Sequence, residues 1–210
     1  MTRILIVDDH AVVRDGVRRI FEGLSPETTV GEASNPQEAI ECVGSASWDA
    51  VVLDISLGGR SGLELIKELK QIRPKLPVLI LSMHSEEQYA RLAFRAGAAG
   101  YITKDNSRAE LVAAVSKVIE GGRYVSPGLA EKLVFDIERG SDRPPHEFLS
   151  GREFEVMCLI ASGKTVGKIA EQLSLSDKTI STYRARILEK MGMKTNAEII
   201  HHAIKNKLVE

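Results

Sequence analysis

The sequence predicts an α/β domain built on a doubly wound, five-stranded parallel sheet, followed by a small all-α domain of four helices. Three observations predict this fold class. Short apolar runs alternate with amphipathic helical patterns over the first 120 residues, the runs are almost continuously apolar, and no strand pattern returns after residue 147. Alternating strands and helices favour βαβ units, and continuously apolar strands are typical of a parallel sheet covered on both faces.

The predicted elements of the first domain alternate along the chain. Apolar runs predict five strands: ILIV (4–7), TTVGEA (28–33), AVVL (50–53), PVLILS (77–82) and AGYIT (99–103). Amphipathic patterns predict helices near 11–23, 36–45, 62–72, 86–96 and 108–120. The stretch EGGRYVSPG (120–128) then breaks the pattern, and a short helical piece (129–139) precedes RGSDRPPHE (139–147), which is typical of a linker.

Capping signals define the helices of the second domain. Two capping boxes mark the starts of its first and last helices: Ser150 with Glu153, and Thr195 with Glu198. Leu149 and Phe154 occupy the positions of a hydrophobic staple beside the first box. Between them lie a short helix, TVGKIAEQL (165–173), and a longer one, DKTISTYRARILEKM (177–191), which begins after Ser176 and ends at Gly192.

Composition and charge bound the class of protein. The 210 residues suit one large domain or two small ones, and 43% hydrophobic with 27% charged residues is ordinary for a globular protein. Residues 1–140 carry 17 Lys and Arg against 20 Asp and Glu, whereas residues 141–210 carry 11 against 9. This asymmetry favours an acidic site in the first part and an anionic partner for the second.

Cellular location is an expectation from what the sequence lacks. Cys42 and Cys158 have no CxxC spacing, which favours reduced, packed thiols. No apolar run approaches the roughly 18 residues of a membrane span, and the first residues lead straight into a strand without a signal peptide. We therefore expect a cytoplasmic protein that has no membrane partner.

Polar and charged residues follow the ends of four predicted strands. These residues are Asp8 and Asp9 after the first strand, Asp54 after the third, Ser82 at the end of the fourth, and Tyr101 and Lys104 at the fifth. Ligands bind at the carboxyl ends of parallel strands, so these groups are expected at one rim. Three close carboxylates repel one another, and Mg²⁺ would relieve that repulsion while leaving room for a phosphoryl oxygen. Asp54 is then a candidate phosphate acceptor, and Lys104 and Ser82 can stabilise the transferred group.

Each of these residues also has an ordinary structural explanation. Asp8 or Asp9 can cap the first helix, Lys104 can be a surface lysine, and Ser82 can be a strand-end hydroxyl. The functional interpretation depends on all of them falling at the ends of the strands that a parallel sheet brings together.

Residues 1–122 resemble a two-component receiver domain of flavodoxin-like fold. The resemblance is carried by VDDH (7–10), LDISLGGRSG (53–62), LSMH (81–84) and GAAGYITKD (97–105). It implies that Asp54 is the phosphoacceptor and that Asp8, Asp9 and the backbone carbonyl of Ser56 join it in binding Mg²⁺. It also implies a switch pair, Ser82 and Tyr101, a phosphate-binding Lys104, and a tuning of phosphate lifetime by Ser56 and His84. Many receivers have Met-Pro where this chain has Leu57-Gly58, which loosens the loop without removing a functional group.

The resemblance implies a switch with a physical outline. A phosphoryl group on Asp54 offers the Ser82 hydroxyl an acceptor, and an inward shift of Ser82 opens space for the Tyr101 ring. The predicted helices 86–96 and 108–120, with the strand between them, would then shift. We expect that face to pair with a second protomer.

The second domain carries a short helix, a three-residue turn and a longer helix, which favour a helix-turn-helix. Ile180, Ile187 and Met191 lie on one side of the longer helix, so that side is expected in the core. Residues 176–194 contain five Lys and Arg against two acids, which suits contacts to phosphates. An ordinary amphipathic helix with a solvated face is the alternative.

Residues 146–208 resemble the LuxR-type output domain of the NarL/FixJ response regulators. LSGREFEVMCLIASGKTVGKIAEQLSLSDKTIST (149–182) and ILEKMGMKTNAEII (187–200) carry the resemblance. It implies that the longer helix enters the major groove of double-stranded DNA and that the last helix contributes to dimerisation. Ser181 and Ala185 stand where family members often have lysines. The candidate DNA-binding residues are Lys178, Thr179, Ser181, Thr182, Arg184, Ala185, Arg186 and Lys190.

These observations predict a phosphorylation-dependent transcription regulator that is not an enzyme toward other substrates. Its expected parts are a receiver (1–122), a linker with a short helix (123–145) and a DNA-binding domain (146–210). A sensor histidine kinase is the expected phosphate donor, and a homodimer is expected on activation. Two alternatives stay open: a regulator that binds DNA without phosphate, and a Mg²⁺-dependent phosphotransferase or hydrolase with an aspartate nucleophile.

Overall fold

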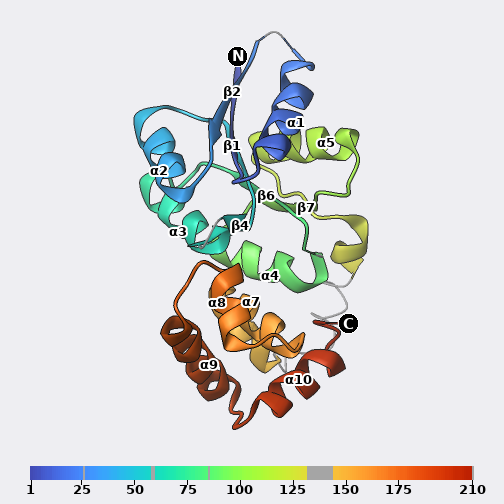
Figure 1. Ribbon diagram of the computed structural model, residues 1–210. Helices are drawn as coiled ribbons and strands as arrows, with labels where there is room; N and C mark the ends of the chain where they lie inside the picture. The colour runs from blue at the N-terminus through green and yellow to red at the C-terminus, as the bar shows by residue number, and fades with distance from the viewer. Residues whose placement is uncertain (26, 58–59, 85, 132–143, 210) are drawn as a thin grey trace. The chain divides into compact units, whose positions relative to one another are not determined.

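The structure, a computed structural model, describes residues 1–209 except 26, 58–59, 85 and 132–143. The chain forms two compact units, Met1–Gly140 and Ser141–Glu210, which are described separately (Figure 1). The first unit is α/β and the second is all-α, so the predicted fold class is confirmed. Among the described residues, no helix is both long enough and apolar enough to span a membrane.

The first unit alternates strands and helices around one parallel sheet. Its five sheet strands are β1 (Thr2–Val7), β2 (Thr28–Ala33), β3 (Ala50–Leu53), β6 (Val78–Ser82) and β7 (Gly100–Thr103). Its helices are α1 (Ala11–Glu22), α2 (Pro36–Ser45), α3 (Gly62–Ile72), α4 (Glu86–Ala96) and α5 (Arg108–Ile119). The strand order is β2-β1-β3-β6-β7 with every pairing parallel.

Helices cover both faces of the sheet, as the continuously apolar strands predict. Helices α1 and α5 contact each other on one side, whereas α2, α3 and α4 form a contiguous row on the other (Figure 1). Ile4 and Ile6 of β1 pack in a cluster with Phe21 of α1 and Val115 of α5. Leu5, which alternates with them in β1, is also completely buried. Both faces therefore contribute to the core, as expected for a parallel sheet.

A short hairpin after β3 was not predicted. Strands β4 (Ser56–Leu57) and β5 (Arg60–Ser61) pair antiparallel, and the Gly58-Gly59 pair between them lies outside the described residues. Gly62 follows the hairpin, and its amide donates to the Ile55 carbonyl at 2.7 Å. A Cβ at Gly62 would lie 2.3 Å from the main-chain oxygen of Asp54, so only glycine permits this close approach.

The chain after α5 returns to the sheet rather than leaving it at once. The Tyr124 amide donates to the Ala99 carbonyl at 3.0 Å, and Tyr124 forms an isolated parallel bridge with Gly100 of β7. The Ser126 hydroxyl hydrogen-bonds to the Glu86 carboxylate. Residues 127–131 are helical, and the remainder of the short helix predicted at 129–139 lies outside the described residues, as does most of the predicted linker.

The second unit contains a 3-10 turn and four helices. They are η1 (Pro145–Phe148), α7 (Gly151–Ala161), α8 (Val166–Gln172), α9 (Asp177–Met191) and α10 (Asn196–Lys205). Both bonds of the Ser150–Glu153 capping box are present. Ile180, Ile187 and Met191 are buried, which confirms the predicted core side of α9.

The second predicted capping box is only half formed. The Thr195 hydroxyl accepts from the Glu198 amide at 3.3 Å, as a capping residue should. The Glu198 carboxylate instead accepts from the Lys194 amide at 2.9 Å, one residue before the cap. The expectation that Glu198 bonds to the Thr195 amide was therefore wrong, because the carboxylate reaches back one residue further and satisfies a different donor.

Candidate functional site

The strand order brings the predicted acidic rim together. β1 and β3 are neighbours, so Asp8 and Asp9 lie beside Asp54, and β6 and β7 bring Ser82 and Lys104 to the same edge. Asp8, Asp54 and Ser82 are buried, with exposed fractions of 2%, 5% and 0%, whereas Asp9 is exposed. Carboxylates are rarely buried unless a cation or hydrogen-bond donors accompany them. These burial values therefore direct attention to what faces Asp8 and Asp54.

Lys104 lies between the two buried carboxylates. Its ammonium nitrogen is 2.6 Å from Asp8 Oδ2 and 2.7 Å from Asp54 Oδ2. Burial lowers the pKa of Lys104, but its bonds to Asp54 and Asp8 outweigh burial and leave the pKa raised. The lysine therefore stays charged and occupies the position where a cation is needed to offset two carboxylates.

Asp54 is held in an environment that disfavours its charge. Burial raises its pKa, the Lys104 bond and charge oppose this, the nearby Asp8 adds to the rise, and the net direction is upward. Its other oxygen, Oδ1, accepts from the Ser56 amide at 3.2 Å. Both Asp54 oxygens therefore have a hydrogen-bond donor, although burial disfavours the charged form.

The donor set at the rim suits a hard divalent cation. Ligand atoms of Asp8, Asp9, His10 and Asp54 all lie within 4.8 Å of one another. Carboxylate oxygens are the ligands that Mg²⁺ takes in proteins, and the exposed Asp9 leaves an open side for water or a phosphoryl oxygen. The residues present therefore fit the predicted Mg²⁺ site.

Two residues that sequence reasoning did not assign support this rim. The His10 amide donates to Asp8 Oδ1 at 2.8 Å, and His10 Nδ1 lies 2.7 Å from Asp9 Oδ1. Arg14 Nη1 donates to the main-chain oxygen of Asp8 at 2.7 Å. The signal was their position within the five residues that follow Asp9, where the first helix begins beside the rim.

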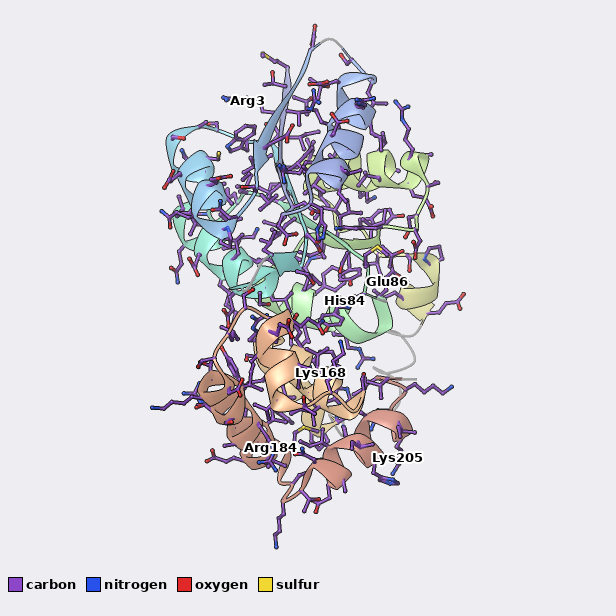
Figure 2. The ribbon with its side chains drawn as sticks, in the orientation of Figure 1. Arg3, His84, Glu86, Lys168, Arg184 and Lys205 are labelled. Atoms are coloured by element: carbon purple, nitrogen blue, oxygen red, sulfur yellow. The ribbon has the colours of Figure 1, made fainter. Side chains whose placement is uncertain are left out.

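The predicted switch residues lie on the neighbouring strands β6 and β7, and both hydrogen-bond to the main chain of His84. The Tyr101 ring is completely buried, and its hydroxyl donates to the His84 carbonyl at 2.9 Å. The Ser82 hydroxyl accepts from the His84 amide at 3.2 Å. The Ser56 hydroxyl lies 3.2 Å from Nε2 of His84, which is labelled in Figure 2. The His84 ring stacks on Tyr89. His84 thus connects the loops that follow Asp54 and Ser82.

The candidate DNA-binding residues differ in how far they are engaged within the second unit. The charged side chains of Lys178 and Arg186 are exposed and form no hydrogen bond or ion pair with the described residues. Arg184, which is labelled in Figure 2, donates from Nε to Asn196 Oδ1 at 2.6 Å. The Lys190 ammonium lies 2.6 Å from the buried Glu153 carboxylate. Free basic groups on α9 are therefore fewer than its composition indicates.

The four remaining candidates are small side chains on α9. Ser181, Thr182 and Ala185 are exposed, and Thr179 is half-buried. The hydroxyl of Thr182 donates to the Lys178 carbonyl at 2.9 Å, and the hydroxyls of Thr179 and Ser176 are 2.8 Å apart. A helix face with such short side chains permits close approach of a partner.

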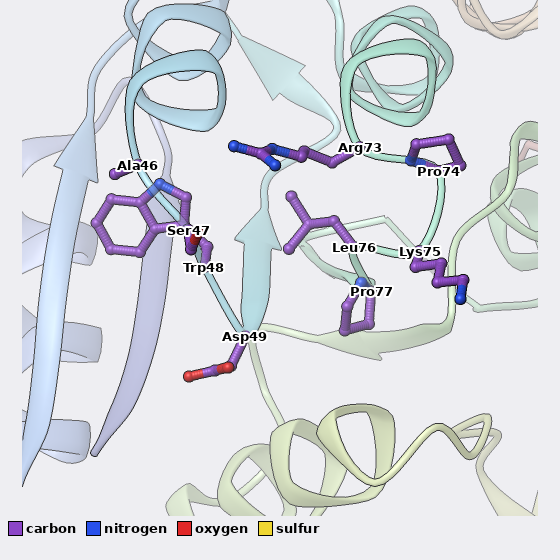
Figure 3. A pocket seen from close by; sticks show the side chains of 9 residues that line it. All are labelled: Ala46, Ser47, Trp48, Asp49, Arg73, Pro74, Lys75, Leu76 and Pro77. Atoms are coloured by element: carbon purple, nitrogen blue, oxygen red, sulfur yellow. The ribbon is translucent and has the colours of Figure 1, made fainter.

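An open pocket of about 510 Å³ is lined by residues 46–49, which precede β3, and 73–77, which precede β6, so it lies at the end of these strands opposite the acidic rim. Trp48 lies on one side of it, and Arg73, Leu76 and Pro77 lie on the other (Figure 3). The Trp48 indole donates to the Cys42 carbonyl at 2.9 Å, so its polar group is already satisfied. Trp48 therefore serves packing here.

Comparisons with known proteins agree across both units. Residues 4–116 match the family model of the response regulator receiver domain, and residues 147–203 match that of the luxR family of bacterial regulatory proteins. The chain is 35% identical over 209 residues to Response regulator UvrY of Escherichia coli K12, covering 99% of this chain and 96% of UvrY. It is 33% identical over 211 residues to Response regulator GacA of Pseudomonas viridiflava, covering 100% and 99%. The solved structure of RcsB from Salmonella typhimurium matches with a TM-score of 0.57 and 25% identity over 97% of this chain and 98% of that one.

Proposed function

The chain belongs to the response regulators that join a receiver to a LuxR-type DNA-binding domain, and we propose that phosphorylation of Asp54 controls its binding to DNA. One observation carries the proposal. The Lys104 ammonium contacts both Asp54 and Asp8, so a cation already bridges the two buried carboxylates at the point where a phosphoryl group would arrive.

The chemistry follows from the groups at the rim. Asp8, Asp9, Asp54 and the backbone carbonyl of Ser56 would hold Mg²⁺, which when bound offsets negative charge on the phosphoryl oxygens. An Asp54 oxygen forms the new P–O bond while the bond from phosphorus to the imidazole nitrogen of a sensor kinase histidine breaks, and its electron pair leaves with the imidazole. Lys104 then neutralises a phosphoryl oxygen, and Ser82 donates to another.

The buried position of Tyr101 bears on how the proposed switch would work. The ring is already buried and bonded to the His84 carbonyl, so phosphorylation would stabilise this arrangement rather than create it. The Ser82 hydroxyl accepts from the His84 amide in the same loop, which ties Ser82 and Tyr101 to one segment. Drawing Ser82 toward a phosphoryl group would therefore fix the His84 loop and the start of α4.

The phosphate lifetime is proposed to depend on Ser56 and His84. Their side chains are 3.2 Å apart and connect the loops on two sides of Asp54. A bridge in this position restricts the approach of water to the phosphoryl group. Replacing either residue is expected to shorten the lifetime of the phosphorylated state.

DNA is the proposed ligand of the second unit. Exposed Lys178 and Arg186 suit contacts to phosphates, and exposed Ser181, Thr182 and Ala185 suit the approach of α9 to base edges in the major groove. The RcsB structure was described in terms of conformational dynamism for DNA interaction. We propose a homodimer on activation and, because DNA is the proposed ligand, a location in the cytoplasm.

The proposed domain boundaries remain a receiver at 1–122, a linker at 123–145 and a DNA-binding domain at 146–210. The contact of Tyr124 with β7 and of Ser126 with Glu86 supports one refinement. The first part of the linker, through about residue 131, would move with the receiver. A change at the start of α4 would then reach the linker directly through Ser126.

The test measures DNA affinity with and without a small phosphodonor in the wild type and in Asp54→Asn. DNA is selected from a random double-stranded pool, and oligomeric state is followed by sedimentation. We expect tighter binding and dimerisation on phosphorylation of the wild type only. Equal affinity in all four samples would favour the alternative of a phosphate-independent regulator. Turnover of a small phosphate ester at catalytic rates would favour the enzyme alternative.

The coupling step has its own test in Tyr101→Ala. The variant should still accept phosphate on Asp54. The Tyr101 hydroxyl bonds to the His84 carbonyl, and among the described hydrogen bonds none joins Tyr101 to the Asp54 carboxylate. DNA affinity should no longer respond to phosphorylation, since the bond that fixes the His84 loop is gone. Normal coupling in this variant would restrict the role of Tyr101 to packing.

A further inference from the structure

We propose that Arg14 is a positioning residue that holds the Asp8–Asp9 loop in the conformation that receives the divalent cation. The inference rests on the proposed function of the acidic rim and concerns how that rim is preformed. Arg14 lies on α1, and its guanidinium reaches back past the start of the helix to the end of β1.

The guanidinium joins three elements of the first unit. Its Nη1 donates to the main-chain oxygen of Asp8 at 2.7 Å, and its Nε donates to Glu32 Oε2 of β2 at 3.2 Å. The Arg14 side chain is only 16% exposed, compared with 37% for that of Glu32. A planar guanidinium with several fixed donors can make both bonds at once, so it fixes the Asp8 carbonyl relative to both α1 and β2.

The acceptor of the Arg14 bond is what makes it suitable for positioning. The Asp8 side-chain oxygens accept from the His10 amide and from Lys104, and a cation bound at the rim would compete for these oxygens. The main-chain oxygen of Asp8 belongs to no proposed ligand set, so the bond to Arg14 can persist when the cation binds. Holding this peptide group sets the direction of the Asp8 side chain and the place of Asp9.

Simple electrostatics predicts the opposite effect from positioning. Arg14 carries a positive charge near the cation site, so removing that charge should strengthen cation binding. Loss of a positioning bond should weaken it, because supporting residues around metal ligands typically contribute about tenfold or more to affinity. The direction of the change therefore separates the two explanations.

A purely structural role is separated by a matched control. Arg18 lies one turn further along α1 and also pairs with Glu32, its Nε lying 3.0 Å from Oε1, but no described contact joins it to Asp8 or Asp9. It forms further ion pairs with Asp15 and Glu22. Arg18→Gln therefore removes an ion-paired arginine from the same helix without touching the loop.

The experiment measures Mn²⁺ binding to the full chain through the electron paramagnetic resonance signal of free Mn²⁺, with Mg²⁺ as competitor. The samples are wild type, Arg14→Gln, Arg14→Lys and Arg18→Gln, each checked for cooperative thermal unfolding. We expect affinity to fall about tenfold in Arg14→Gln and to stay within about twofold in Arg18→Gln. Arg14→Lys keeps the charge but lacks the planar guanidinium that reaches both the Asp8 carbonyl and Glu32. The affinity of this variant for Mn²⁺ should therefore fall by an intermediate factor.

Unchanged or tighter Mn²⁺ binding in the folded Arg14 variants would overturn the inference. If Arg14→Gln does not fold, Arg14→Lys decides alone, because it preserves charge and most of the packing. A folded wild type that binds neither cation would overturn the proposed function of the rim and this inference with it. A wild type that binds both, beside unaffected Arg14 variants, would overturn this inference only.

Discussion

The acidic rim of the receiver and the outward face of α9 are two charged regions built in opposite ways. At the rim, the Asp8 and Asp54 carboxylates are buried at the ends of separate strands, and both contact the Lys104 ammonium that lies between them. On α9, the side chains of Lys178 and Arg186 are exposed on one helix and form no ion pair or hydrogen bond with any other described residue. The proposed function of the rim therefore depends on the geometry of groups bonded to one another, whereas that of the α9 face depends on exposed charge.

This difference sets the size of the expected effects. Removing one member of the rim leaves a buried charge without its partner, which is costly in both stability and chemistry. Removing one member of the α9 face subtracts one solvated contact and leaves the remaining residues as they are.

Replacing Lys104 is expected to have the largest effect. Lys104→Met removes the charge that bridges Asp8 and Asp54, so the pKa of Asp54 should rise further and a transferring phosphoryl group should lose a stabilising cation. Loss of one such electrostatic donor typically costs about 100-fold in rate. The rate of phosphorylation by a small phosphodonor measures this, with the exposed Lys67→Met as control. A rate within about twofold of wild type would remove Lys104 from the chemistry.

Replacing Arg186 is expected to have a moderate effect on DNA affinity alone. Arg186→Ala removes one exposed charge, so affinity should fall across all DNA sequences and the slope of log affinity against log salt should decrease by about one. Binding titrations at several salt concentrations measure the slope. Lys190→Ala is the internal comparison, because Lys190 is already paired with Glu153 and should change the slope less. An equal change in both variants would contradict the distinction between free and paired cations.

Lys190 should matter for stability rather than for binding. Its ammonium is the partner of Glu153, whose side chain is only 4% exposed. Burial raises the pKa of Glu153, but the Lys190 bond and the Ser150 amide outweigh burial and lower it. Lys190→Ala should therefore destabilise the second unit by about 1 kcal/mol, the usual net contribution of one hydrogen bond. The Ser150 amide still donates to the same Glu153 oxygen in this variant. Calorimetry of the full chain measures this, and Arg186→Ala should leave the transition unchanged.

The smallest effect is expected from pH at the His146–His202 contact. Nδ1 of His146 lies 2.9 Å from Nε2 of His202, and burial, Lys205 and His201 lower the pKa of His202. A lowered pKa means that the folded state favours neutral His202. The stability that His202 contributes to the second unit is therefore fully present above about pH 6.5 and is lost as the pH falls below that value. Hydrogen exchange of α10 at pH 7.5 and 5.5 measures this. His202→Asn should reduce the difference, whereas the exposed His201→Asn should retain most of it, because His201 is the smallest of the three influences on His202.

The fold and the rim were predictable because both follow from local patterns. Continuous apolar runs identified the five sheet strands, and the rule that parallel strands direct ligands to their carboxyl ends placed Asp8, Asp54 and Lys104 together. The Ser150–Glu153 capping box was predictable for the same reason, since both of its hydrogen bonds join residues three apart.

Contacts between distant residues were not predictable. The bonds of Arg14 to Glu32 and of Lys190 to Glu153 join residues on different elements, so neither appears in a periodic pattern. Helical periodicity places Lys190 on α9 but does not show that its charge is already engaged. The close approach at Gly62 depends on the hairpin formed by β4 and β5, whose two-residue strands are too short to be recognised.

The central claim is that Asp54 accepts a phosphoryl group, and intact mass tests it most directly. The folded full chain is incubated with Mg²⁺ and a small phosphodonor beside Asp54→Ala, and both are weighed by mass spectrometry. We predict the mass of a single phosphoryl group on the wild type and none on the variant. The same added mass on both proteins would contradict the claim. So would a folded wild type that binds Mg²⁺ but accepts phosphate neither from the small phosphodonor nor from any histidine kinase tested.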